Sequence, residues 1–257
     1  MTHYVLNSII PNIQIPNNVR AISSMGQSYN VSVSQQSVSR AIMEVAEAIV
    51  NVLGPRWIKF PVTRNEKNII KARFMEAVNF PGTIGAMDCT HVAILAPVQE
   101  EHNYINRHGS HSKNVQLVCD YDLKILNINA RYAGATHDAY IFRNSVINRE
   151  LERCYNLGDQ NTWFIGDSGY PQLPWVMTPV LHALPDTPEF RYNEAHIRAQ
   201  NCIERCNAVL KGRRLDPDFE IPDLQRNNIV NAQIPPNNYA NIDGRNARDV
   251  FINQYFT

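Results

Sequence analysis

Three predicted strands of this sequence end at, or run up to, an aspartate. The runs are 84–88, 131–138 and 163–167, and a fourth carboxylate lies on a predicted helix further along the chain. Hard cations such as Mg²⁺ take oxygen ligands, and phosphoryl-transfer enzymes use clustered carboxylates to place one or two such ions beside the reacting oxygens. The pattern therefore predicts a metal-binding site whose ligands are Asp88, Asp138, Asp167 and Glu204.

The predicted helix that carries Glu204 has one apolar face. Its apolar residues recur at helical spacing, at Ala199, Cys202, Ile203, Cys206, Val209 and Leu210. Glu204 lies at the margin of this stripe, where it either joins the metal site or pairs with a neighbouring arginine in solvent. Cys202 and Cys206 are one turn apart, but no second pair matches them, so we predict core thiols rather than half of a zinc site.

The chain divides into four regions by its sequence pattern. Residues 1–24 contain proline and no helical period, and we expect a loose N-terminal arm. Residues 25–79 are predicted to form a small helical module. Ser34 caps the first helix of this module, and Gly54–Pro55 ends it. Thr63 and Glu66 form a capping box that starts the second helix. The first helix either offers its polar start to a DNA major groove, as a reduced helix-turn-helix-like segment, or packs as an amphipathic helix on the next domain.

We predict that residues 80–215 form an α/β domain and that residues 216–257 form an irregular tail. We expect strands over 84–88 and 91–95, 114–119, 124–131 and up to Asp167, with a helical segment over 138–154. Asp120 and Asp122 lie in a tight connection, so they are predicted to be turn residues rather than ligands. The tail is rich in proline, asparagine and aspartate, and only 246–256 has a helical pattern.

Composition favours an intracellular globular protein without a strong overall attraction for DNA. The 24 basic and 24 acidic side chains balance, so any contact with phosphate depends on local patches. Five cysteines without framework spacing indicate reduced thiols. No stretch approaches a membrane span and the start lacks the pattern of a signal peptide, so we expect no membrane partner.

Six short runs resemble one family, and they occur in the family's order. They are Gly85–Ala86–Met87–Asp88–Cys89–Thr90–His91, Tyr104–Ile105–Asn106–Arg107–His108–Gly109, Asn114–Val115–Gln116, Thr136–His137–Asp138, Gly166–Asp167–Ser168–Gly169–Tyr170–Pro171 and Asn201–Cys202–Ile203–Glu204–Arg205. Together they resemble the catalytic domain of PIF/Harbinger-type DDE transposases, and most of all the nuclease-like proteins derived from them. The resemblance implies an RNase H-like mixed sheet flanked by helices.

The resemblance also implies roles for the carboxylates. Asp88, Asp167 and Glu204 correspond to the catalytic DDE triad, and Asp138 is an additional ligand unless it instead caps the helix that follows it. The implied cofactor is Mg²⁺ or Mn²⁺, as two ions about 3.5–4 Å apart, and the implied reaction is cleavage of DNA phosphodiester bonds. The implied location is the nucleus, with the cytoplasm as a second location, and a separate Myb-like DNA-binding protein is the implied partner.

Two basic patches are predicted to contact the DNA backbone, which positions a protein without reading sequence. One is a polar, flexible loop over 106–113 with Arg107 and Lys113, and the other is a helix face with Arg198, Arg205 and Lys211. Either patch is alternatively an ordinary solvated surface.

Departures from the family pattern keep two other functions open. Cys89 stands where the family usually has glycine, and residues 216–246 lack the family's arginine- and aromatic-rich stretch, which we attribute to an internal deletion. The first alternative is a catalytically inactive, domesticated DNA-binding or scaffold protein. The second is a truncated product without a function.

Overall fold

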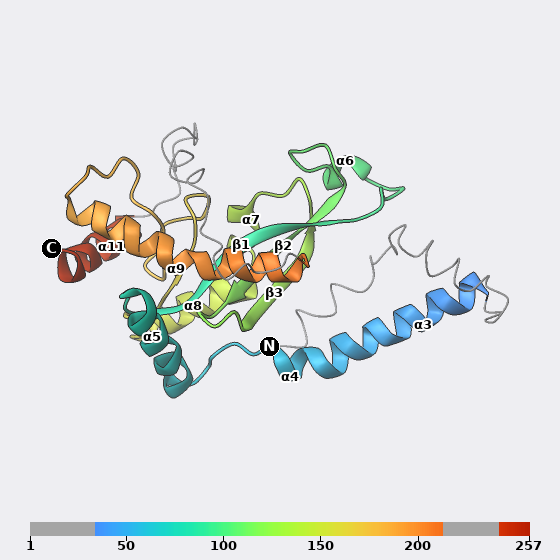
Figure 1. Cartoon of the computed structure of the whole chain (residues 1–257), viewed down its shortest axis with the longest axis horizontal. Coiled ribbons are helices and arrows are strands. Elements are labelled where there is room, and N and C mark those ends of the chain that lie inside the picture. Colours follow the sequence, from blue (N-terminus) through green and yellow to red (C-terminus); the bar gives the residue numbers. More distant parts are fainter. Residues whose placement is uncertain (1–33, 213–241) are drawn as a thin grey trace. The chain divides into compact units, whose positions relative to one another are not determined.

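The computed structural model describes residues 34–212 and 242–257. Its elements are α3 (Gln35–Ala48), the π-helix η2 (Ile49–Leu53), α4 (Gly54–Trp57), α5 (Arg64–Val78), β1 (Thr83–Ala93), α6 (Glu101–Tyr104), β2 (Ser112–Cys119), β3 (Ile125–Ala133), α7 (Asp138–Arg143), α8 (Val146–Asn156), β4 (Trp163–Ile165), β5 (Val176–Met177), α9 (Pro188–Leu210) and α11 (Ile242–Tyr255). Figure 1 labels all of them except η2, β4 and β5. The predicted N-terminal arm and the irregular part of the tail lie outside the described residues.

The strands form a five-stranded sheet in the order β3-β2-β1-β4-β5. β1 pairs with β4 in parallel, with Thr83 opposite Trp163 and Ala86 opposite Ile165, and β4 pairs with β5 in parallel. Helices alternate with the later strands, which is typical of an α/β domain. The sheet and its helices confirm the predicted RNase H-like α/β class.

The chain forms two compact units, and three strands contribute residues to both. In the described residues, the first unit contains 34–60, 89–117 and 127–141. The second contains 61–88, 118–126, 142–212 and 242–257. Asp88, Asp167 and Glu204 all belong to the second unit, whereas Asp138 belongs to the first.

Local sequence explains where the early helices begin. The Ser34 hydroxyl accepts a hydrogen bond from the Ser37 amide at 3.2 Å, so Ser34 caps α3 as predicted. Thr63 and Glu66 form the predicted capping box of α5: the Thr63 hydroxyl accepts from the Glu66 amide at 3.2 Å, and the Glu66 carboxylate accepts from the Thr63 amide at 2.9 Å.

The prediction that Gly54–Pro55 ends the first helix is wrong. The backbone widens into the π-helical turn η2 and continues as α4, which ends at Trp57. Pro55 lies in the first turn of α4, where a missing amide proton leaves no helical hydrogen bond unmade. A proline at that position begins a helical segment instead of ending one.

The predicted helix over 138–154 is two helices, α7 and α8, because Ser145 interrupts it. The Ser145 hydroxyl accepts from the Asn148 amide at 3.1 Å and so starts α8 anew. Two strands also differ from expectation: β2 begins at Ser112 rather than 114, and the two-residue strand β5 was not predicted. The last helix, α11, begins at Ile242, before the predicted start.

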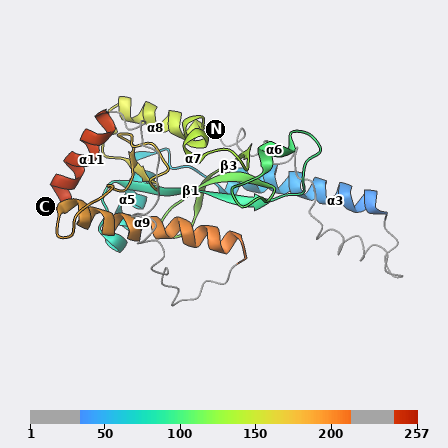
Figure 2. The same cartoon turned by 90° about the horizontal axis from the view of Figure 1, so that it is seen from above.

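In the second unit, α9 packs against α5, α11 and β4. Figure 2 shows α11 against the first half of α9. Aromatic rings fill the contact: Tyr192 and Phe256 have ring centroids 5.7 Å apart, and Phe80 and Phe251 have centroids 5.2 Å apart. All four side chains are buried, so this cluster fixes α11 to α9.

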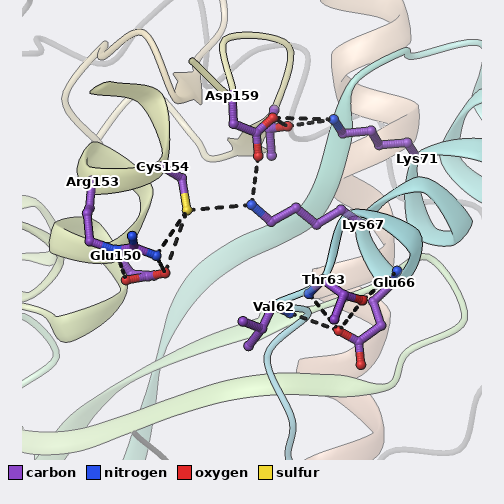
Figure 3. Close-up of polar contacts among 10 residues, drawn as sticks. Val62, Thr63, Glu66, Lys67, Lys71, Glu150, Arg153, Cys154 and Asp159 are labelled. Carbon is purple, nitrogen blue, oxygen red and sulfur yellow. Dashed lines mark hydrogen bonds and ion pairs between the residues drawn. The ribbon is translucent and has the colours of Figure 1, made fainter. Parts of the chain in front are cut away.

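An ion pair attaches α5 to the end of α8 (Figure 3). The Lys67 ammonium donates to Asp159 at 2.7 Å and contacts the Cys154 sulfur at 3.6 Å. Burial by itself would lower the pKa of Lys67, but the hydrogen bond and charge of Asp159 outweigh burial and raise it. Burial would likewise raise the pKa of Asp159, and Lys67 and Thr162 hold that pKa below its usual range. Both partners are therefore charged at neutral pH.

Among the described residues, no helix combines the length and apolar character needed to cross a bilayer.

Candidate active site

Asp88 and Asp167 each follow, by two residues, one member of a residue pair on two adjacent parallel strands. Asp88 lies two residues after Ala86 in β1, and Asp167 lies two residues after Ile165, just beyond the end of β4. Ala86 and Ile165 are the last paired residues of the two strands, and a continuation of this register by two residues would bring the two aspartates to the same level. Neighbouring strands are about 4.8 Å apart. The Gly166 amide still donates to the Met177 carbonyl at 3.1 Å, so the strand pairing with β5 continues up to the residue before Asp167.

Gly166 is required at this edge by close packing. A Cβ at Gly166 would lie 3.0 Å from the terminal methyl of Met87 and 3.0 Å from a ring carbon of Tyr170, and both side chains are fully buried. That distance is too short for carbon atoms in ordinary contact. With glycine at position 166, the chain can pass from β4 into the turn at Asp167 without displacing the buried side chains of Met87 and Tyr170.

The side chain of Asp167 is held by its own turn. One carboxylate oxygen accepts from the Gly169 amide at 2.9 Å, and the Asp167 carbonyl accepts from the Tyr170 amide at 3.2 Å. Tyr170 is fully buried and its ring lies 5.9 Å from the ring of Phe142. The turn over Asp167–Tyr170 therefore orients the aspartate through backbone hydrogen bonds.

Helix α9 reaches Asp88 through Asn207. The Asn207 side-chain nitrogen donates to the Asp88 carboxylate at 2.9 Å. Glu204 lies three residues earlier, on the same face of the helix, and is half-buried. The sheet edge with Asp88 and Asp167 and the helix face with Glu204 thus lie in one compact unit, joined by a hydrogen bond.

Sequence reasoning did not find Asn207. Its one available signal is the three-residue spacing from Glu204, which places both on one helix face. The other partner, Asp88, is 119 positions away in the sequence. A helix periodicity cannot show which strand a polar residue will contact across such a separation.

Buried side chains hold α9 on the sheet. The Cys202 and Cys119 sulfurs are 3.9 Å apart, and Cys202 and Cys206 are buried, as predicted for core thiols. His196 is fully buried and its Nε2 donates to the Met177 carbonyl at 3.1 Å. Burial lowers the pKa of His196 to about 4, so the imidazole is neutral at physiological pH.

Asp138 has a different setting from the other three carboxylates. It is the first residue of α7 and half-buried, and its carboxylate accepts from the Asn114 side-chain nitrogen at 2.7 Å. A carboxylate in the first turn of a helix also interacts favourably with the helix dipole. Its role as an additional ligand stays a prediction.

The residues predicted to contact DNA differ in exposure. Arg107, Arg198 and Lys211 are exposed and Arg205 is half-buried. Lys113 differs from them: it lies inside β2 with 8% of its surface exposed, and its ammonium donates to the Ala130 carbonyl at 3.3 Å. Burial lowers the pKa of Lys113. The loop before it is held together by Asn106, whose side-chain oxygen accepts from two amides of the loop, at 2.9 Å and 3.2 Å.

The side chains at this edge of the sheet offer the kind of donor atoms that a hard divalent cation prefers. Asp88, Asp167 and Glu204 offer carboxylate oxygens, the ligands that Mg²⁺ and Mn²⁺ prefer. The side-chain oxygen of Asn207 is buried and has no hydrogen-bond partner in the described part of the chain. As the side chains stand in residues 34–212 and 242–257, no group of three or more His, Cys, Asp or Glu residues is arranged to hold a metal ion.

Comparison with known proteins places most of the sheet and α9 in one family. Residues 87–214 match the family model described as DDE superfamily endonuclease. A relative from Bos taurus, named "Putative nuclease HARBI1", is 35% identical over 184 residues, which cover 71% of this chain and 51% of the relative. The Xenopus laevis protein of the same name is 32% identical over 207 residues, 79% of this chain and 57% of the relative.

A plant protein is also similar. "Protein ALP1-like" of Arabidopsis thaliana is 25% identical over 205 residues, 75% of this chain and 49% of its own length. The chain spans about half the length of the relatives it matches. No solved structure matches it. The matched segment contains Asp88, Asp138, Asp167 and Glu204, and residues 87–214 of this chain therefore belong to the DDE superfamily endonucleases, as the resemblance to PIF/Harbinger proteins predicted.

Proposed function

We propose that this chain is a transposase-derived, metal-dependent DNA endonuclease that cleaves phosphodiester bonds with two divalent cations. The observation that supports the proposal is the register of β1 and β4, whose last paired residues, Ala86 and Ile165, each lie two positions before an aspartate, Asp88 and Asp167. The hydrogen bond from Asn207 to Asp88 adds the helix that carries Glu204. The family of residues 87–214 supports the same chemistry.

Each residue of this site has a distinct task in the proposal. Asp88, Asp167 and Glu204 would hold the cations. When bound, two such cations activate the attacking oxygen and stabilise the leaving oxygen of a phosphodiester. The turn at Asp167 fixes the direction of its carboxylate before any ligand arrives, which reduces the ordering that binding requires. Asn207 does the same for one oxygen of Asp88.

DNA binding would depend on cations of α9 rather than on overall charge, since the net charge of the chain is zero. Arg198 and Arg205 are seven residues apart on α9, which is two turns, so they lie on one side of the helix. We propose that they and Lys211 contact phosphates, and that exposed Arg107 contributes from the first unit. Because these contacts are few, we propose that a Myb-like protein supplies DNA targeting and nuclear entry.

A plasmid-nicking assay tests the proposal. The purified chain should nick supercoiled DNA with Mg²⁺ or Mn²⁺ and lose this activity with a chelator. Asp167→Asn should abolish nicking, whereas Glu76→Gln, a change at a carboxylate whose side chain is 75% exposed, should leave it intact. Absence of metal-dependent nicking in the wild type, with and without a Myb-like partner, would favour the alternative role as a DNA-binding or scaffold protein.

A further inference from the structure

Asn207 has one satisfied and one unsatisfied polar atom, although it is 8% exposed. Its nitrogen donates to Asp88, and its oxygen has no hydrogen-bond partner among the described residues. Buried amide oxygens in folded proteins nearly always have a partner, which is a protein group, an ordered water or a cation. The oxygen of Asn207 can therefore accept a partner from outside the protein, either a water or a cation.

The charge of Asp88 fixes which atom of Asn207 is unsatisfied. An ionised carboxylate only accepts hydrogen bonds, so the side-chain nitrogen must face it. Rotating the amide by half a turn would direct its oxygen at the carboxylate oxygens, which would repel it. The free atom is thus the oxygen, an acceptor, bonded to the same carbon as the nitrogen that contacts Asp88.

The surroundings of this oxygen favour a cation over other ligands. An anion would meet an amide oxygen and the carboxylate of Asp88, both of which repel it. Amide oxygens of asparagine are common ligands of hard divalent cations, beside carboxylates. A second carboxylate, that of Asp167, follows Ile165 of β4 by two residues, as Asp88 follows Ala86 of β1, and Ala86 and Ile165 are paired.

We propose that Asn207 is both the positioning residue of Asp88 and an additional oxygen ligand of the divalent cation that Asp88 holds. Its nitrogen fixes one carboxylate oxygen, and its oxygen joins the ligand set. The inference rests on the proposed function, because it concerns the same cation. Asn207 adds a ligand without adding negative charge, so it limits the repulsion among Asp88, Asp167 and Glu204 before the cation binds.

Titration of the full-length chain with Mn²⁺, without DNA, tests this role. Electron paramagnetic resonance measures free Mn²⁺ and therefore the affinity, and the same samples give the thermal stability without metal. Asn207→Leu keeps the approximate size of the side chain and removes both polar atoms. It should weaken Mn²⁺ binding by about 10-fold or more, the range for residues that support metal ligands. Its metal-free stability should change little, because the loss of the hydrogen bond to Asp88 and the removal of the unsatisfied oxygen act in opposite directions.

Two further variants separate a ligand from a merely structural residue. Asn207→Asp restores an oxygen ligand and should recover Mn²⁺ binding, at the cost of lower metal-free stability from repulsion with Asp88. Asn253→Leu makes the same change at an exposed asparagine of α11 and should bind Mn²⁺ like the wild type.

The results of these titrations distinguish the role of Asn207 from the proposed endonuclease function on which that role rests. If Asp88→Asn loses Mn²⁺ but Asn207→Leu binds it like the wild type, the proposed function survives and the role of Asn207 is refuted, with a buried water as the partner of its oxygen. If Asn207→Leu unfolds and Asn207→Asp does not recover binding, Asn207 is structural only. If the wild type binds no Mn²⁺, both proposals fail.

Discussion

Acid should loosen the attachment of α9 to the sheet, because His196 is buried without charge. Its Nε2 donates to the Met177 carbonyl, and burial lowers its pKa from 6.5 to about 4. The unfolded chain binds a proton near pH 6.5 and the folded chain does not until about pH 4. Stability from this residue is therefore complete above about pH 6.5 and falls as the pH decreases toward 4. At about 1.36 kcal/mol per pKa unit, the loss is about 3 kcal/mol.

Urea unfolding at a series of pH values from about 7 to about 4.5 measures this loss. His196→Gln keeps a donor for the Met177 carbonyl but cannot take up a proton in this range. It should therefore lower stability at neutral pH and flatten the dependence on pH. His102→Gln, at an exposed histidine of α6, is the matched control and should unfold like the wild type at each pH. Equal pH dependence in the wild type and in His196→Gln would refute the reasoning.

Three other predictions test the packing around the site. Lys67→Met should lower the free energy of unfolding by about 1–3 kcal/mol in urea titrations. This loss is smaller than for a fully buried ion pair, because the Asp159 side chain is 33% exposed. No change would show that the ion pair does not stabilise the fold. Phe251→Ala should cost about 3–5 kcal/mol, and a smaller loss in thermal unfolding would mean that α11 contributes little to the unit. Glu204→Gln should fold normally and lose metal-dependent nicking, whereas Ile203→Asp, at a fully buried position, should unfold the second unit. Circular dichroism distinguishes the last two, and a folded Ile203→Asp would contradict the placement of the apolar face.

Local features of the fold could be predicted from the sequence. Ser34 and the Thr63–Glu66 capping box start helices where expected, because the partners of each cap lie within four residues. Helical periodicity predicted most of the buried face of α9: Ala199, Cys202, Ile203 and Cys206 are buried, whereas Val209 and Leu210 at the end of the helix are exposed. The family resemblance supplied the fold class and the order of the carboxylates.

Features that depend on distant residues could not be predicted. Pro55 is a helix-ending signal by itself, and only the π-helical turn before it makes it the start of another segment. Lys113 has a charged side chain in a polar stretch, yet pairing of β2 with β3 buries it. The contact of Asn207 with Asp88 joins two residues whose surroundings in the sequence are unrelated.

The central claim is that Asp88 and Asp167 hold divalent cations together. A crystal structure of the protein soaked with Mn²⁺, with anomalous scattering to locate the metal, measures this directly. We predict Mn²⁺ bound by the carboxylates of Asp88 and Asp167, and, where two ions are present, a separation of about 3.5–4 Å between them. The claim would be contradicted by well-ordered Asp88 and Asp167 carboxylates more than about 8 Å apart, with Mn²⁺ bound elsewhere or not at all. Two ions about 3.5–4 Å apart could not contact both carboxylates across such a distance.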